Sequence, residues 1–508
     1  MTAISTAVGL ERRSRTSGYK IKKGFFEPNT PNLAQIVAVL GEANTANQAN
    51  LDTDPFEFTS AQEVGERYGY GSPLHQVARI LRPSNSEGIA GIPTVIIPQV
   101  SDVAASATSH DWTVTGAATE NATHSLVISG RRNVDFQEYS FTVVKGDSAE
   151  TIAQKMADAV NSVLSSPATA TVDPLTPTIV TLTTKWSGAT SSELKTRISI
   201  GSKPAGITYS QSSITAGAGA VDLAGALGHF NNVWYTSVIN PYTAHLDTLE
   251  QYNGIPDPEN PTGRYEGTTF MPFMAYFGST LDDKDALAAI TDAAARVDQV
   301  TNVLCPAPKS EAFPWEAAAN AVRVFARIMQ DNPHLDINNK SYPDMPVPDN
   351  GNIGDMSVYN NRDFLVKKGC STVILDNGAY KVQDFVTTYH PAGESPLQYA
   401  YARNLNLDWN VSFTYRVIEN VSVKDHVLVA DGQVTGVDKA IKPAEWKAVL
   451  STLFEDLANR ALLNDPEFSK TSLQVQRSTA NPDRFETSFR YRRTGIARIE
   501  STDVEAGF

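Results

Sequence analysis

Residues 361–390 have the sequence NRDFLVKKGCSTVILDNGAYKVQDFVTTYH, and this stretch decides how the C-terminal part of the chain folds. Asn377 and Gly378 both tolerate positive φ, so the Asp-Asn-Gly sequence predicts a tight hairpin turn between two short strands. The flanking residues are rich in the β-branched and aromatic types that strands favour. The residues expected to build the hairpin are Val373, Leu375, Tyr380, Val382, Phe385 and Thr387.

Length and composition indicate a multidomain globular protein. The chain has 508 residues, which predicts roughly three domains of about 150 residues each. It is 41% hydrophobic and 19% charged, which is ordinary for a protein that folds in water. No apolar run resembles a signal peptide or approaches the roughly 20 residues of a membrane span. We therefore expect the chain to stay in the cytoplasm where it is made.

The net charge bears on which partners the protein binds, and the cysteine content bears on the compartment in which it folds. The net charge of −14 argues against nucleic acid as the main partner. Basic residues nevertheless gather near both ends, where they could meet nucleic acid or an acidic protein surface, or simply be solvated. Only Cys305 and Cys370 are present, which suits a reducing compartment and predicts two buried free thiols rather than a disulfide.

The first hundred residues divide into an arm and an α/β segment. Residues 1–22 show no helical period and carry few apolar side chains, so they cannot fold alone and form an arm that is free or folds on a partner. These apolar residues are Ile4, Val8 and Leu10. After residue 23, a strand, two helices and another strand are expected, with Ser60 and Glu63 placed as a capping box.

Residues 101–220 differ from their surroundings, because Thr, Ser, Ala and Gly dominate and apolar residues alternate with polar ones. This pattern predicts an inserted antiparallel β domain. One helix interrupts it, opened by Asp147, with Ile152, Met156 and Val160 on its buried stripe. A carbohydrate-binding β module would have the same composition.

After residue 220 the pattern returns to alternating strands and helices. Strands near 234–240, 270–277 and 300–304 and helices over 282–297 and 316–329 predict a partly parallel sheet. The Gly-Ala run before them lacks the signature of a phosphate-binding loop, so we interpret it as the re-entry into the core. A Pro/Asn/Asp-rich loop follows, and its spacing departs from that of a calcium loop, so we expect turns there rather than a metal site.

The C-terminal region contains a long predicted helix and a second arm. Residues 443–463 carry a continuous apolar stripe at spacings of three and four. Two strands follow, around Val475 and Phe489, and they could lie beside the 361–390 hairpin. Residues 494–508 contain Ile496 and Ile499 but no core of their own.

No catalytic, cofactor-binding or metal-binding motif is found. The eight histidines stand at no metal-ligand spacing, and no nucleophile elbow or paired-cysteine motif occurs. His390 and Asp384 could be imagined as an acid/base pair, but a structural polar role is the simpler expectation. The absence of these motifs argues against an enzyme but does not exclude one.

Several segments of the sequence, taken in chain order, resemble segments of contractile tail sheath proteins. They are Ala218-Gly219 to Leu227, the hairpin ending in Val386-Thr387-Thr388-Tyr389, and the C-terminal helix followed by Asn481-Pro482-Asp483-Arg484-Phe485. The inserted segment, from Gly146 to Ala153 and from Val180 to Gly188, is similar to that of Mu-like sheaths. Sheaths of myophages, R-type bacteriocins and other contractile injection systems belong to this group.

The resemblance implies an α+β multidomain fold. An α/β sheath core with a mixed sheet would carry an inserted antiparallel β domain and extended N- and C-terminal arms. The expected domains are an N-terminal donor arm at 1–22, a first core segment at 23–100, an outward-projecting β domain at 101–220, a second core segment at 221–360, a C-terminal domain with the acceptor hairpin at 361–493, and a C-terminal donor arm at 494–508.

The resemblance also implies a structural function, with no enzymatic activity and no cofactor. Subunits of this family polymerise as stacked hexameric rings around a tail tube and contract to drive the tube through the host envelope. The expected partners are other copies of the chain, the tail tube protein, and baseplate and tail terminator proteins. Nucleic acid and membrane insertion are not expected, and the location would be the virion tail, assembled in the host cytoplasm.

Strand donation would hold such subunits together. Family members add the arms of neighbouring subunits to a hairpin in the C-terminal domain, and this chain has two arms and a suitable hairpin. A basic set could face an acidic tube surface: Arg484, Arg490, Arg492 and Arg493. The alternative is a glycan-binding or glycan-cleaving tail protein, suggested by the Thr/Ser-rich β domain.

Overall fold

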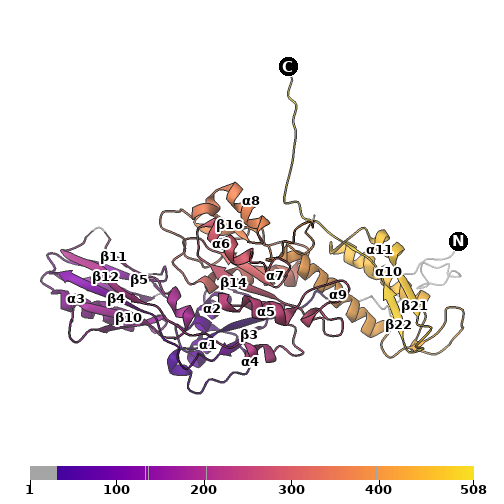
Figure 1. The fold of residues 1–508 in the computed structure, drawn as a ribbon, viewed down its shortest axis with the longest axis horizontal. Helices are drawn as coiled ribbons and strands as arrows, with labels where there is room; N and C mark the ends of the chain where they lie inside the picture. Colours follow the sequence, from indigo (N-terminus) through magenta and orange to yellow (C-terminus); the bar gives the residue numbers. More distant parts are fainter. Residues whose placement is uncertain (1–30, 132, 135–136, 202, 395–396, 508) are drawn as a thin grey trace, which may run out of the picture. The chain divides into compact units, whose positions relative to one another are not determined.

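The computed structural model describes residues 31–131, 133–134, 137–201, 203–394 and 397–507 (Figure 1). Residues 32–508 group into one compact unit. Within it the chain forms a mixed α/β structure with several sheets, consistent with the predicted α+β multidomain class. The domain boundaries proposed from the sequence stay a prediction.

The central sheet has six strands in the order β15-β14-β13-β1-β3-β2. The first five are mutually parallel, and β2 pairs antiparallel to β3 at the edge, so the predicted partly parallel, mixed sheet is confirmed. The strands are β1 Val37–Glu42, β2 Phe56–Glu57, β3 Thr94–Gln99, β13 Ser237–Ile239, β14 Met274–Ser279 and β15 Asn302–Pro306. All residues of β1, β14 and β15 are buried, as expected for parallel strands covered on both faces.

Successive residues of β1 pack into different cores, because side chains alternate across a sheet. Val37 and Val39 join the core that includes α2 and α7, whereas Ala38 and Leu40 join a second core with α4 and α5. The helices of this region are α1 Ala61–Tyr68, α2 Pro73–Leu81, α4 Ala224–Gly228, α5 Leu246–Asn253, α6 Lys284–Thr291 and α7 Pro314–Asp331. The helix predicted over 282–297 is thus shorter than expected.

Two helix starts test the predicted caps. Ser60 Oγ accepts a hydrogen bond from the Glu63 N–H at the start of α1, as predicted. The helix in the insert, α3 Ala149–Asn161, is instead capped by Ser148, so the prediction that Asp147 opens it is wrong. The Asp147 carboxylate accepts from the Val144 N–H in the preceding turn and pairs with Lys155.

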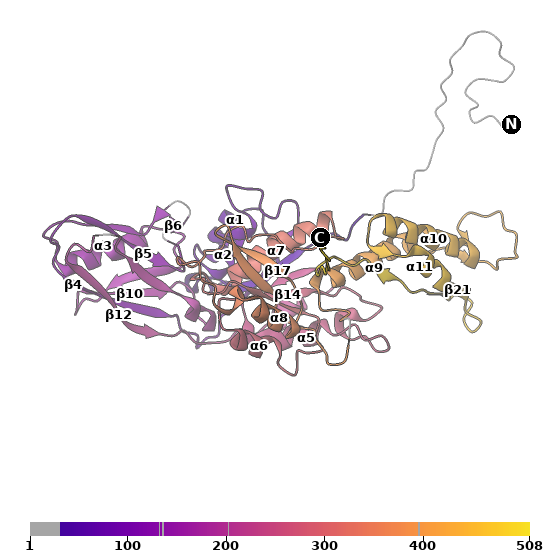
Figure 2. The same ribbon diagram turned by 90° about the horizontal axis from the view of Figure 1, so that it is seen from above.

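The inserted segment forms two antiparallel sheets, in the orders β12-β4-β10-β9 and β11-β5-β8. Helix α3 packs against these strands (Figure 2). Its predicted stripe of Ile152, Met156 and Val160 is fully buried. The strands are β4 Ser109–Gly116, β5 Ala122–Ile128, β8 Ser140–Val143, β9 Ala168–Val172, β10 Ile179–Thr184, β11 Thr196–Ser199 and β12 Ile207–Thr215. A further pair joins β6 Asn133–Val134 and β7 Gln137–Glu138.

The C-terminal region contains the predicted hairpin and several helices. They are α8 Tyr359–Lys367, β16 Thr372–Asp376, β17 Ala379–Asp384, α9 Ala402–Ser422, β18 Val427–Leu428, β19 Ala440–Ile441, α10 Pro443–Asn459, β20 Leu463–Asn464, α11 Pro466–Ser472, β21 Gln474–Arg477, β22 Phe485–Ser488 and β23 Arg492–Arg493. The 21-residue helix α9 was not expected from the sequence.

Two predictions for this region need correction. The helix expected to reach residue 463 ends at Asn459. The chain then enters the short strand β20, Leu463–Asn464, which pairs with β23 and cannot be helical. Strands β21 and β22 form a hairpin of their own and pack against α10, whereas the β16–β17 hairpin belongs to a different core. The expectation that these strands lie beside the 361–390 hairpin is therefore wrong.

Candidate subunit-linking site

The hairpin turn has the geometry that its sequence predicts. Asn377 has φ of 50° and Gly378 has φ of 74°, so both central residues occupy the left-handed region of a type I′ turn. Asp376 pairs with Ala379 directly across the turn. Both central residues are exposed, so the turn projects from the body of the fold.

The hairpin is packed firmly onto the core. Val373, Tyr380, Val382 and Phe385 are each at most 1% exposed. The Phe385 ring lies parallel to that of Tyr276, with centroids 5.9 Å apart and 12° between planes. Leu375 is half-buried beside the same cluster. One face of the hairpin is therefore part of the main hydrophobic core.

The predicted Thr387 lies beyond β17 and serves a different contact. Its N–H donates to the Ala400 carbonyl at 2.7 Å, and its hydroxyl donates to the Tyr399 carbonyl at 2.8 Å. The next residue, Thr388, donates its N–H to the carbonyl of Asn302 on β15. This segment joins the hairpin to the central sheet and to the residues that precede α9.

The outer edge of β17 is already paired within the chain. The Tyr342 N–H donates to the Tyr380 carbonyl at 2.8 Å, and the Val382 N–H donates to the Lys340 carbonyl at 2.9 Å. The Asn339 N–H also donates to the Val382 carbonyl at 2.8 Å. We call residues 339–342 the covering strand, because they occupy the edge at which a new strand would otherwise add.

The outer edge of β16 is the remaining position for an added strand. Because Asp376 and Ala379 close the two-residue turn, backbone groups of Val373 and Leu375 point away from β17. No backbone hydrogen bond joins these outward groups to any other described part of the chain. The 3-10 helix η5, Gly354–Ser357, contacts β16 without bonding to this edge. Val373 is fully buried and Leu375 is half-buried, so an incoming strand could reach this edge only at its Leu375 end, next to the turn.

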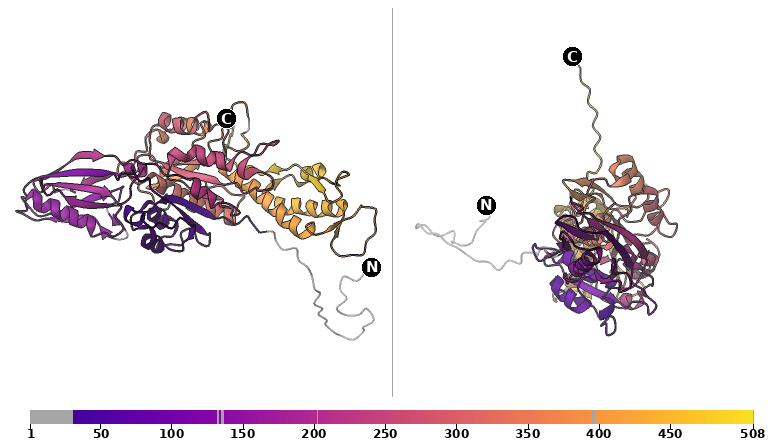
Figure 3. Two further views of the ribbon diagram at one scale, coloured as in Figure 1. Left: turned by 60° about the horizontal axis from the view of Figure 1, so that its bottom comes forward. Right: turned by 90° about the vertical axis from the view of Figure 1, so that its left-hand side faces the viewer.

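The predicted arms differ in what the structure describes of them. Ile4, Val8 and Leu10 lie outside the described residues. At the other end, Ile496 is half-buried and Ile499 is 91% exposed. From Ile499 to Gly507 every residue is exposed and has no regular secondary structure, and the segment runs away from the fold (Figures 1 and 3). The free portion of this arm begins later than the predicted residue 494.

The four arginines proposed to face the tube have different surroundings. Arg484 is exposed and pairs with Glu486, and Arg490 is exposed without a described partner for its guanidinium. Arg492 pairs with Asp465 at 2.8 Å and stacks over Phe468. Of the four, only Arg490 has no described partner for its charge.

Arg493 is committed to an internal ion pair. Its Nε and Nη2 donate to the two oxygens of Asp408, at 2.6 and 2.5 Å, and the Tyr491 hydroxyl donates to the same carboxylate. Burial lowers the pKa of Arg493, but the hydrogen bond and charge of Asp408 outweigh this effect and raise it overall. The pair ties the last strand to α9, so a role of Arg493 in facing the tube stays a prediction that this geometry weakens.

The carboxyl ends of the parallel strands are covered by the inserted segment. Ligand sites of parallel α/β sheets usually lie at this edge. Here Thr190 donates to the buried Glu42 carboxylate at the end of β1, at 3.2 Å. The Lys195 ammonium donates to the Ser310 carbonyl at 3.0 Å. The edge is thus a joint between insert and core.

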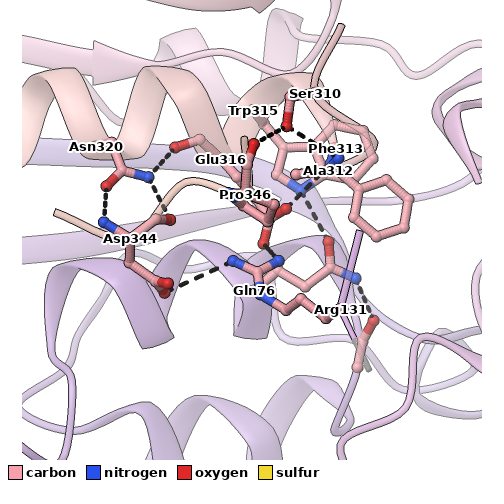
Figure 4. A network of polar contacts seen from close by, with 11 residues as sticks. Gln76, Arg131, Ser310, Ala312, Phe313, Trp315, Glu316, Asn320, Asp344 and Pro346 are labelled. Atoms are coloured by element: carbon pink, nitrogen blue, oxygen red, sulfur yellow. Dashed lines mark hydrogen bonds and ion pairs between the residues drawn. The ribbon is translucent and has the colours of Figure 1, made fainter. Parts of the chain in front are cut away.

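An ion pair reinforces the same joint from the neighbouring loop. Arg131 Nη1 lies 2.5 Å from Glu316 Oε1 at the start of α7, with side chains 13% and 1% exposed (Figure 4). The other Glu316 oxygen accepts from the Phe313 N–H at 3.0 Å. Burial raises the pKa of Glu316, and the charge of Arg131 offsets some of that rise. Asp344 also belongs to the network, because its backbone carbonyl accepts from the Asn320 side-chain amide and its N–H donates to the oxygen of that amide (Figure 4).

The remaining candidate chemistry is structural. His390 pairs with Asp292 at 2.8 Å, and Asp384 accepts from the Thr372 hydroxyl instead. Cys305 and Cys370 are buried free thiols, and burial raises both pKa values. No metal-binding cluster of His, Cys, Asp or Glu occurs among the described residues. No helix in the described portions of the chain is long and apolar enough to cross a membrane.

Comparison with known proteins shows which protein the chain resembles in sequence. It is 25% identical over 427 residues to the Mu-like prophage FluMu tail sheath protein of Haemophilus influenzae, covering 82% of each chain. The predicted resemblance to tail sheath proteins is confirmed. The similarity to this tail sheath protein extends well beyond the hairpin and includes most of the chain.

Two further comparisons concern solved structures and family models. The sheath tail protein of Desulfitobacterium hafniense aligns in structure with 94% of this chain and 100% of its own, at a TM-score of 0.44 and 12% identity. No protein-family model matches the sequence.

Proposed function

We propose that the chain is a structural subunit of a contractile tail sheath. The observation that carries this proposal is the sequence similarity to a Mu-like tail sheath protein over 82% of both chains. As a sheath subunit it would polymerise as stacked hexameric rings around a tail tube and contract to drive the tube through the host envelope. Its partners would be other copies, the tube protein, and baseplate and tail terminator proteins, within the virion tail.

The connection between subunits is proposed to be strand addition at the outer edge of β16. The outward backbone groups of the half-buried Leu375 have no described partner, while Val373 is fully buried and the edge of β17 is occupied by the covering strand. The donors would be residues 1–22 and the free C-terminal arm that begins at Ile499. Such a contact is head-to-tail, so it propagates into rings or helical tubes.

Electron microscopy of the purified chain tests assembly directly. The intact protein is expected to form rings or hollow tubes in negative stain as its concentration rises. Truncations lacking residues 1–22 or 499–508 should fold and stay dispersed. Leu175→Ser is a matched control, because Leu175 lies on the insert and is 93% exposed. Tubes from both truncated proteins would refute strand donation, and dispersed particles that bind a polysaccharide would favour the glycan-binding alternative.

A proline substitution in β16 tests which edge accepts the strand. Leu375→Pro removes an N–H that points away from β17, so the hairpin bonds persist while the acceptor edge is blocked. Leu375→Ala is the matched control, because it shortens the side chain and keeps the N–H. We expect tubes from the alanine variant and dispersed, folded protein from the proline variant. Normal tubes from both would show that β16 is not the acceptor.

A further inference from the structure

The C-terminal segment changes abruptly from bound to free after Arg498. Upstream, Thr494 donates its hydroxyl to the Ala461 carbonyl at 2.6 Å, and the Arg403 guanidinium donates to the Thr494 carbonyl at 2.5 Å. Arg403 is 2% exposed and also donates to the carbonyl of His334. Downstream, every residue from Ile499 to Gly507 is exposed.

Arg498 is the last residue held by the fold. Its guanidinium pairs with Asp336, whose side chain is 3% exposed, and lies 3.6 Å from the centre of the Tyr401 ring. The Arg498 side chain is itself only 15% exposed. A guanidinium that is both paired and stacked in a largely buried place is held more firmly than one on an open surface.

The partner of Arg498 belongs to the loop that leads into the covering strand. Asp336 Oδ1 accepts from the Ile337 N–H at 2.7 Å, which fixes the carboxylate to the backbone of this loop. The covering strand that follows makes its hydrogen bonds with Tyr380 and Val382 of β17. A cavity of about 530 Å³ at this place is lined by both Asp336 and Arg498 and by Asp384 at the end of β17.

The geometry points to Arg498 as the anchor that joins the free C-terminal arm to the covering strand of the acceptor hairpin in the same chain. The arm then begins at Ile499. A force applied to the arm would be transmitted to β17 through Asp336 and the covering strand that follows it. The anchoring stands on the contacts of the single chain. Its role in carrying load between copies rests on the proposed sheath function, with a second copy as the partner of the arm.

Trypsin cleavage after Arg498 tests the anchor in the isolated, full-length protein. Trypsin must take the arginine side chain into its specificity pocket, so a clamped Arg498 is a poor substrate. Release of residues 499–508, followed by mass spectrometry, should be at least about tenfold slower than from a synthetic peptide of residues 494–508. Cleavage of the native protein at the peptide's rate would overturn the anchor.

Substitutions around Arg498 separate the anchor from general unfolding. Tyr401→Leu removes the ring and Asp336→Asn removes the charge, and each should speed cleavage after Arg498 about tenfold. Tyr401→Phe keeps the ring and is the matched control, with cleavage expected at the native rate. Arg498→Lys keeps a trypsin site but loses the planar guanidinium, so it should also be cleaved faster. Circular dichroism checks that each variant is folded, and equal rates in all folded variants would refute the assignment.

Shearing of assembled tubes tests load transmission separately. Tubes of Arg498→Ala should break into pieces several-fold shorter than wild-type tubes under the same shear, measured by electron microscopy. If the wild-type protein forms no tubes, the sheath proposal fails while the trypsin result still judges the anchor. If tubes of both proteins break equally, Arg498 carries no load.

Discussion

Removing Arg131 should destabilise the joint between insert and core more than an ordinary surface ion pair would. Arg131→Met leaves the Glu316 carboxylate, 1% exposed, without its cation and with the Phe313 N–H as its remaining described donor to Oε2. Breaking a buried pair in this way costs about 3–5 kcal/mol. The 54%-exposed Asp344, 3.6 Å from Arg131, adds little because exposed pairs are worth at most about 1 kcal/mol.

The assay is urea unfolding followed by tryptophan fluorescence, since Trp186 packs against Trp315 beside this network. Glu316→Gln and the Arg131→Met/Glu316→Gln double variant complete a double-mutant cycle. The double variant should recover much of the loss, because a neutral amide needs no cation. An unchanged midpoint for Arg131→Met, or an equal loss in the double variant, would refute this reasoning.

The pH dependence of the Arg131→Met variant gives a second check. Without Arg131, burial holds the pKa of Glu316 above its unfolded value, so protonation favours the folded state. The loss of folding stability caused by the ionised Glu316 carboxylate is then absent below the pKa of about 4.3 that Glu316 has in the unfolded chain. This loss grows as the pH rises toward the pKa of Glu316 in the folded variant. We expect the variant to approach wild-type stability as the pH falls from 7 to 5. The double variant, which lacks the carboxyl group, should show no such recovery.

Three further predictions concern the core, a buried acid and a helix cap. Phe385→Ala should lower the free energy of unfolding by about 3–5 kcal/mol, because its fully buried ring leaves a cavity, whereas Ile499→Ala at an exposed position should change it by less than about 0.5 kcal/mol. Burial raises the pKa of Glu42 to about 7, so the stability that its protonated form contributes is lost as the pH rises from 4.5 through 7. The Glu42→Gln variant should therefore show a weaker dependence of the urea unfolding midpoint on pH between about pH 5 and 8. Ser60→Ala should cost about 1 kcal/mol in thermal unfolding, and no loss would show that the cap at α1 is dispensable.

Helix α9 shows why one large element escaped prediction. Its apolar residues do not form a single stripe, because Asn406 and Asn410 are fully buried alongside Leu405 and Trp409. Asn410 Nδ2 donates to the Asn406 carbonyl at 2.9 Å, which satisfies one buried amide within the helix. A helix covered on several faces loses the amphipathic period by which a helix is found in a sequence.

The candidate site was only partly predictable. The hairpin was found because Asn-Gly specifies a type I′ turn through local backbone sterics. The covering strand was not found, because residues 339–342 lie in a loop with no strand-like pattern and pair with β17 only through the tertiary fold. The anchor at Arg498 likewise depends on Asp336, which lies 162 residues earlier in the chain.

The amino-acid sequence alone indicates the five parallel strands of the central sheet but not the edge strand β2, and it also indicates the composition of the insert, the Asn-Gly turn and the resemblance to sheath proteins. These features follow from side-chain periodicity, local sterics and residue order, which need no distant partner. The folded chain adds that the outer edge of β16 makes no backbone hydrogen bond to other described residues, that Arg493 pairs with Asp408, and that the residues from Ile499 to Gly507 are exposed. Each of these features depends on contacts between residues far apart in the sequence, and local sequence patterns do not specify such contacts.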